Sequence, residues 1–184
     1  MVTSGSQSGS QSIEIGGNTQ LDQVITLAGH QITGIDEVWL DDEQVLFGAS
    51  PDPKWSTQIY NPDRNTYRVA DHKVYVELNN GAAGNPALAT LIARTTKWTS
   101  AHKQSGRAHL LLTLVSDAVL FPDGMPDATF TVRGKPVIDL QTLIPSYTDN
   151  AARIIADYLT DSVYGLGYDY DDIELDTGAS GSLS

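Results

Sequence analysis

The 184-residue chain contains no cysteine, so disulfide bonds, thiolate nucleophiles and Cys-ligated zinc or iron–sulfur sites are excluded. No apolar run approaches the roughly 18 residues that a membrane-spanning helix needs. The N-terminus also lacks the basic-then-apolar pattern of a signal peptide. G-x-S-x-G, Walker-type and dinucleotide-binding motifs are missing as well, so the sequence offers no evident serine nucleophile or nucleotide site.

Basic residues are scarce, with 11 Lys and Arg against 23 Asp and Glu and a formal net charge of −12. This balance disfavours nucleic-acid binding and docking on anionic lipid. Ten of the bases lie between Lys54 and Lys135, and no acid occurs between Glu77 and Asp117. These charges either solvate loops or meet an acidic flank, in the same chain or in a neighbouring subunit. The candidate interface residues are Arg94, Lys97, Lys103 and Arg107.

Both ends of the chain have little apolar surface. Nine of residues 1–12 are Ser, Gly or Gln, and residues 177–184 read TGASGSLS. Such composition does not offset the entropy cost of ordering, so we expect a flexible linker or tag at 1–12 and a flexible tail at 177–184. The sequence then predicts a single α+β domain over 13–176.

Strand patterns dominate the part between the ends. Alternation over 73–80 predicts one buried and one solvent-facing side, whereas the apolar run 109–116 predicts a central strand covered on both faces. The Asp41-Asp42 pair supplies a turn inside a hairpin. The predicted strands and hairpin are 23–29, 35–47, 73–80, 109–116 and 128–134.

Two helices are expected. The first begins at Asn85-Pro86, a capping residue followed by proline at the first helical position. The second, over 149–161, is capped by Thr148 or Asp149. Its apolar stripe is expected to pack on the sheet and consists of Ala151, Ile154, Ile155, Tyr158 and Leu159. The fold class is therefore α+β, mainly antiparallel β-sheet with one or two helices packed on it.

Candidate metal ligands are weak. Asp169, Asp171 and Asp172 offer hard oxygens for calcium, but the loop glycine and terminal Glu of a helix–loop–helix site are missing. An edge strand or linker explains the same run. His102 and His109 could pair across a turn, although exposed or core-edge histidines are more common. We therefore expect neither a metal nor a cofactor.

Aromatic residues suggest an alternative, a carbohydrate-binding or adhesin-like β module. Trp55, Tyr60 and Tyr67 lie in a Pro-rich connection and could stack on sugars, although such residues more often fill a core or an interface. A hydrolase is a third hypothesis, and no constellation of residues supports it.

Four segments, in this order, resemble the hub part of phage tail-tip attachment proteins, the protein J type of lambda-like siphophages. They are LAGHQITGIDEVWLDDEQV (27–45), TKWTSAHKQSGRAHLLLTL (96–114), FPDGMPDATFTVRGKPVID (121–139) and YTDNAARIIADYLTDSVYGLG (147–167). The resemblance runs from about Leu21 to about Asp172. Its structural motif residues include Phe121, Pro122, Gly124, Pro126, Arg133, Gly134, Lys135, Asn150, Tyr164 and Gly165.

The resemblance implies a structural, non-enzymatic hub domain of a tail tip, acting in tail assembly, host recognition and genome delivery. It implies a homotrimer that contacts the distal tail protein and the tape measure and reaches the host receptor indirectly. The location implied is the virion tail, assembled in the bacterial cytoplasm. Two features depart from the family: Ala151 stands where the family has Pro, and Ser/Gly segments replace the flanking β-barrel and fibre regions. We therefore expect one excised hub domain.

Overall fold

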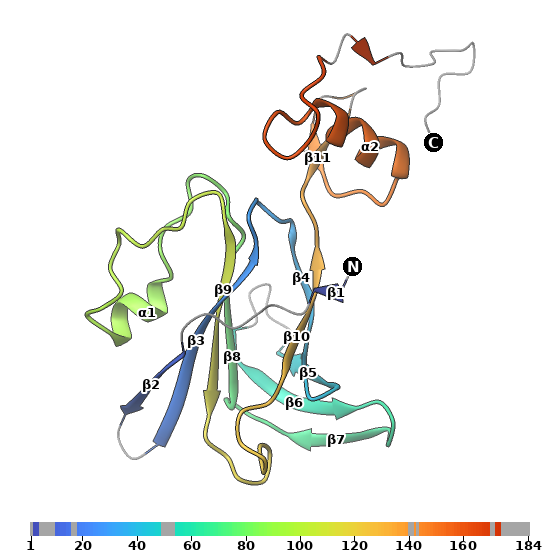
Figure 1. The fold of residues 1–184 in the computed structure, drawn as a ribbon. Helices are drawn as coiled ribbons and strands as arrows, with labels where there is room; N and C mark the ends of the chain where they lie inside the picture. Colours follow the sequence, from blue (N-terminus) through green and yellow to red (C-terminus); the bar gives the residue numbers. More distant parts are fainter. Residues whose placement is uncertain are drawn as a thin grey trace. The chain divides into compact units, whose positions relative to one another are not determined.

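A computed structural model describes residues 2–3, 10–15, 18–48, 54–139, 142, 144–169 and 172–173. The chain groups into two compact units, Met1–Gly134 and Lys135–Ser184. The described residues are mainly antiparallel β-strand with two short helices, which confirms the predicted fold class (Figure 1).

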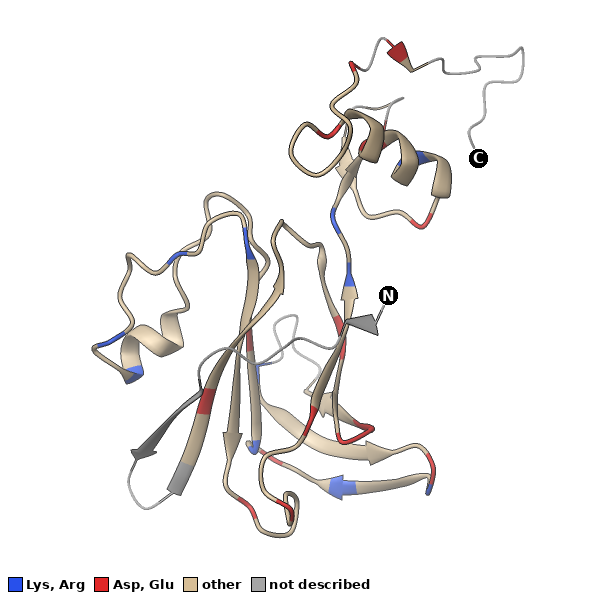
Figure 2. Cartoon of the chain, in the orientation of Figure 1, with Lys and Arg blue, Asp and Glu red and all other residues tan. Residues whose placement is uncertain are grey.

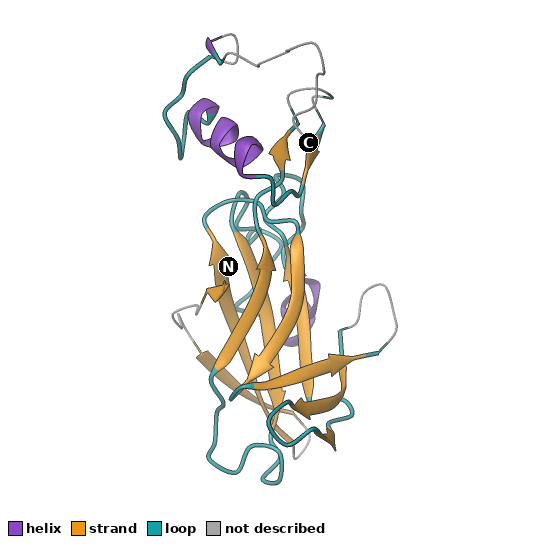
Figure 3. Ribbon diagram, turned by 90° about the vertical axis from the view of Figure 1, so that its right-hand side faces the viewer, coloured by secondary structure: helices purple, strands orange, loops and turns teal. Residues whose placement is uncertain are grey.

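The first unit holds ten strands and one helix among its described residues. Their bounds are β1 Val2–Thr3, β2 Ser10–Ile15, β3 Asn18–Ala28, β4 Gly34–Leu40, β5 Glu43–Phe47, β6 Ser56–Asn61, β7 Thr66–Val69, β8 Val74–Asn79, α1 Ala89–Arg94, β9 Ala108–Val115 and β10 Ala128–Arg133. One sheet has the order β1-β10-β4-β5-β6-β7 and the other β2-β3-β9-β8. Side chains of both sheets meet in one apolar core, so the unit is a β-sandwich (Figure 3).

The core follows from the alternation of apolar residues along the strands. Phe130 of β10 is fully buried, and Val38 of β4 faces Val45 of β5 in register. Asp41 and Asp42 join β4 to β5 with φ of 49° and 62°, the left-handed conformation that two-residue hairpin turns require. The predicted 35–47 hairpin is confirmed.

Strand β9 is buried along most of its length, as its apolar run predicts. Leu110 and Leu112 face the sandwich core, whereas Leu111 packs on the outer face against α1. The same outer layer covers Tyr75 of β8, which is 5% exposed. The prediction that one face of 73–80 is wet was therefore wrong, because an alternating strand pattern does not reveal a helix packed on its polar side.

Helix α1 begins at Ala89, three residues later than the Asn85-Pro86 pattern predicts. The Asn85 side chain instead donates to the side-chain oxygens of Asn79 and Asn80. The Glu77 carboxylate accepts the first helical N–H groups, those of Ala89 and Thr90, at 3.2 and 3.3 Å. A carboxylate from the neighbouring strand thus takes the place of a local cap.

The second unit contains β11 Val137–Ile138, β12 Pro145–Ser146 and α2 Ala151–Thr160. Strands β11 and β12 pair antiparallel, and α2 packs against β11. Asn150 caps α2, since its Oδ1 accepts the N–H groups of Ala152 and Arg153. Thr148 and Asp149 are not the cap, because Thr148 Oγ1 instead accepts the N–H of Asn150.

Within the second unit, α2 leaves most of its apolar stripe exposed, and the packing of this stripe on the sheet stays a prediction. Ile154, Ile155 and Tyr158 are exposed, and Ala156 is the buried residue of the helix. Ion pairs made by the opposite face of α2 determine this orientation and are described below.

The expected flexible ends lie largely outside the described residues. Within them, Val2–Thr3 pairs with β10 and Ser10–Ser12 pairs with β3 through backbone register. The single domain predicted over 13–176 stays a prediction, because contacts within each compact unit do not report whether the two fold together.

Candidate functional site

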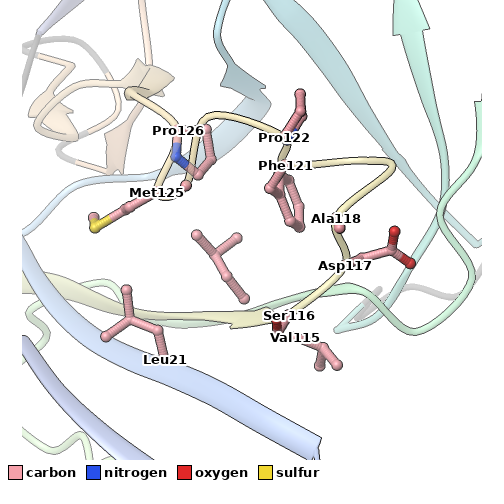
Figure 4. Close-up of a pocket in the computed structure, with 11 residues that line it drawn as sticks. Leu21, Val115, Ser116, Asp117, Ala118, Phe121, Pro122, Met125 and Pro126 are labelled. Atoms are coloured by element: carbon pink, nitrogen blue, oxygen red, sulfur yellow. The ribbon is translucent and has the colours of Figure 1, made fainter.

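The F-P-D-G-M-P motif lies in the loop that crosses from β9 in one sheet to β10 in the other (Figure 4). Asp117 fixes the start of this loop. Its Oδ1 accepts the N–H groups of Val119 and Leu120 at 3.0 and 3.2 Å, and its Oδ2 pairs with Lys73 Nζ at 3.0 Å. The hydrogen bond from Lys73, followed by those from the two backbone N–H groups, lowers the pKa of Asp117.

A second clamp holds the same loop. Arg68 Nη1 donates to the carbonyl oxygens of Val119 and Leu120, and its Nη2 pairs with Glu43. Gly124, with φ of 98°, supplies the left-handed residue of the turn. These contacts hold the loop between β9 and β10 in a defined conformation. The motif lies in this loop, as expected of a turn motif.

Two hollows flank this crossover loop. The first, of about 310 Å³, is mostly apolar, and Leu21, Phe121 and Met125 line it from a strand and from the loop (Figure 4). The second, of about 570 Å³, is polar, with Glu43 and Arg68 in its wall. Pro122, Gly124 and Pro126 border both. The charged group of the first hollow, Asp117, is bound to Lys73, and Glu43 in the wall of the second is bound to Arg68.

The V-R-G-K motif closes the end of β10. Arg133 pairs with Asp36 at 2.8 Å, and the carbonyl oxygens of Arg133 and Gly134 both accept the N–H of Thr33 at 3.0 Å. Lys135 then belongs to the second unit.

Lys135 binds two carboxylates of α2 and its end. Its Nζ donates to Asp157 at 2.8 Å and to Asp161 at 2.5 Å. Burial lowers the pKa of Lys135, but the hydrogen bonds to the two carboxylates outweigh this effect and raise it. The Lys135 bond, with the N–H groups of Tyr164 and Val163, lowers the pKa of Asp161.

The Y-G-x-G motif wraps the end of α2. The N–H of Tyr164 donates to Asp161 Oδ1, and that of Leu166 donates to the carbonyl oxygen of Tyr158 at 3.0 Å. A Cβ at Gly165 would lie 1.8 Å from the same Tyr158 oxygen, so only glycine fits. The helix end thus requires this glycine for a steric reason.

The structure separates the four predicted interface bases. Arg94 Nη1 donates to Asp22 at 2.6 Å and to Thr113 at 2.9 Å beneath α1, so it is engaged inside the first unit. Lys97, Lys103 and Arg107 are exposed in the segment between α1 and β9. The sequence analysis did not predict the Asp22–Arg94 pair. The available signal was Asp22 itself, the single acid within the otherwise largely apolar segment 21–28.

The three aromatic residues of the alternative hypothesis do not form one face. Tyr60 and Tyr67 stack at 4.8 Å between ring centroids on the β6–β7 hairpin. Trp55 packs on Tyr75 at 4.9 Å, at the edge of the other sheet.

The metal candidates are scattered. His109 is fully buried and its Nδ1 bonds the Arg107 carbonyl oxygen, while His102 is exposed and stacks on Trp98. Asp169 and Asp172 share a backbone hydrogen bond, and Asp171 lies outside the described residues. No group of three or more acidic or histidine side chains within the described part of the chain is arranged to hold a metal ion.

No family model matches the chain, and no curated protein matches it. Among the described helices, none has the length and apolar character needed to cross a bilayer.

Proposed function

We propose that the chain is a structural component of a bacteriophage or prophage tail tip, a hub domain of the host-attachment protein. It acts by assembly with other copies and with the distal tail and tape-measure proteins. The proposal starts from the four ordered sequence segments that resemble such hubs.

One observation carries the proposal: residues of the resemblance motifs fix the backbone at a crossover loop, at a helix end and within the second unit. The F-P-D-G-M-P segment forms the crossover between sheets, and Gly165 is sterically required at the end of α2. Lys135 holds Asp157 and Asp161 within the second unit. These roles are those of a scaffold, and they explain the motif without any reacting group.

Deletion of the coding sequence from the phage or lysogen that carries it tests the function. We expect particles that fail to adsorb or lack a complete tail tip, with infectivity restored by the wild-type gene in trans. A matched complementation with Asp63→Ala should restore infectivity too, because this side chain is exposed on the β6–β7 turn. Unchanged infectious yield after deletion would refute the proposal.

A further inference from the structure

Helix α2 turns its charged face toward the rest of the second unit and leaves its apolar face exposed within that unit. Arg153 pairs with Asp139 at 3.0 Å, and Asp157 binds Lys135, so the charged face is turned inward. Ile154, Ile155 and Tyr158 are 46%, 58% and 54% exposed. A surface helix normally buries its apolar stripe, so this arrangement indicates a stripe reserved for a partner.

The segment after α2 enlarges this apolar surface. Its backbone is tied to the helix by bonds from Leu166 N–H to the Tyr158 oxygen and from Tyr168 N–H to the Leu159 oxygen. The C-terminal apolar surface is defined by Ile154, Ile155, Tyr158, Val163, Tyr164, Leu166 and Tyr168, all of them exposed.

The size of the C-terminal apolar surface suits a protein interface. A tyrosine buries roughly 150–250 Å² when fully covered. The three half-exposed tyrosines alone therefore present on the order of 300 Å², as much as the largest apolar patch of many monomers.

The charged side chains of the second unit that form no ion pair among the described residues are acidic. The two bases of the second unit, Lys135 and Arg153, are both bound within it. Asp149, Asp169 and Asp172 are exposed and have no basic partner among the described residues. A fitting partner is therefore apolar and positively charged.

The first unit offers a surface of this kind. Lys97, Lys103 and Arg107 are exposed and have no acidic partner in the described part of the chain. The stretch from α1 to β9 is coloured for basic residues and not for acidic ones in Figure 2. Ile92 of α1 is exposed beside these bases in sequence, and no acid lies between Glu77 and Asp117. We call residues 92–107 the basic segment.

We propose that the C-terminal apolar surface of one copy binds the basic segment of a second copy. The two surfaces differ, so the contact is head-to-tail and each copy can use both surfaces at once, which builds a ring or a chain of copies. This inference rests on the proposed function, which it deepens by naming the surfaces through which copies meet.

Charge reversal tests the contact by light scattering of the purified full-length chain. One variant carries Lys97→Glu, Lys103→Glu and Arg107→Glu, and the other carries Asp149→Lys, Asp169→Lys and Asp172→Lys. Each alone should associate at least tenfold more weakly than the wild type, and mixing the two should restore association, because the reversed charges again complement each other. Raising the salt concentration should weaken the wild-type assembly.

Two further variants separate the contact from other effects. Ile155→Ser should also weaken association at least tenfold, without loss of folding, since the side chain is exposed. Arg64→Glu, on the exposed β6–β7 turn, should leave association unchanged. A wild-type chain that stays monomeric, or a mixture that fails to associate, overturns the inference. The deletion test of tail function is independent of these measurements, so either proposal can fail alone.

Discussion

Arg94 Nη1 lies 2.6 Å from Asp22 Oδ1, and this contact joins α1 to β3 beneath the outer face of the sandwich. The Asp22 side chain is 2% exposed, so removing its partner leaves a buried charge. We expect Arg94→Ala to lower the free energy of unfolding of the first unit by about 3 kcal/mol. Urea unfolding followed by tryptophan fluorescence measures this, because Trp39, Trp55 and Trp98 all lie in that unit.

Lys97→Ala is the matched control for Arg94→Ala. Lys97 is three residues away but exposed, so its loss should change the free energy of unfolding by less than about 0.5 kcal/mol. Equal effects of the two substitutions would show that the Arg94–Asp22 pair does not stabilise the fold.

Gly165 and Gly134 belong to the same resemblance but differ in surroundings. A Cβ at Gly165 meets the Tyr158 oxygen at 1.8 Å, whereas one at Gly134 meets no atom within 4 Å. Gly165→Ala should therefore destabilise the end of α2 by at least about 2 kcal/mol, and Gly134→Ala should be nearly neutral. Amide exchange of the α2 N–H groups compares the two. Equal protection in both variants would contradict the steric role of Gly165.

Asp161 makes the second unit sensitive to acid. Its folded-state pKa lies below the ordinary value of 3.8, so the unfolded state binds more protons near that pH. The stability contributed is fully present above about pH 3.8 and is lost as the pH falls through the lower folded-state pKa.

Asp161→Asn should accordingly destabilise α2 by about 1–3 kcal/mol at pH 6, where the carboxylate is charged and hydrogen-bonded. The difference from wild type should shrink toward pH 2. Amide exchange of α2, corrected for the intrinsic rate at each pH, gives the comparison. A difference that stays constant across this range would rule out the ionised carboxylate as its source.

The β4–β5 turn can be stabilised. Asp42 has φ of 62°, a conformation that glycine adopts without strain. Asp42→Gly should raise the free energy of unfolding by up to about 1 kcal/mol, and Asp42→Ala should lower it. Thermal unfolding distinguishes the two, and the opposite order would mean that the Asp42 side chain itself holds the turn.

The strands and the fold class could be predicted because the alternation of apolar and polar residues is a local property of the sequence. The β4–β5 hairpin and the doubly covered β9 follow directly from residue order. The start of α1 did not follow, since Glu77 of a neighbouring strand caps it. Long-range contacts of this kind leave no local signal.

The candidate surfaces show the same limit. The sequence between Glu77 and Asp117 contains no acid, which agrees with the exposure of Lys97 and Lys103. The partial burial of Arg94 could not be predicted in this way, because it depends on Asp22, 72 residues away. The periodic pattern of the sequence predicts the apolar stripe of α2, but it does not determine whether the apolar or the charged face packs within the second unit. Lys135, bound to Asp157 and Asp161, turns that stripe outward.

Immunogold labelling of purified particles tests the central proposal most directly. Antibodies raised against the full chain should bind at the distal end of the tail in particles from the encoding phage or lysogen, and should not bind particles from the deletion strain. Particles that contain none of this chain, or label at the head alone, would contradict its assignment to the tail tip.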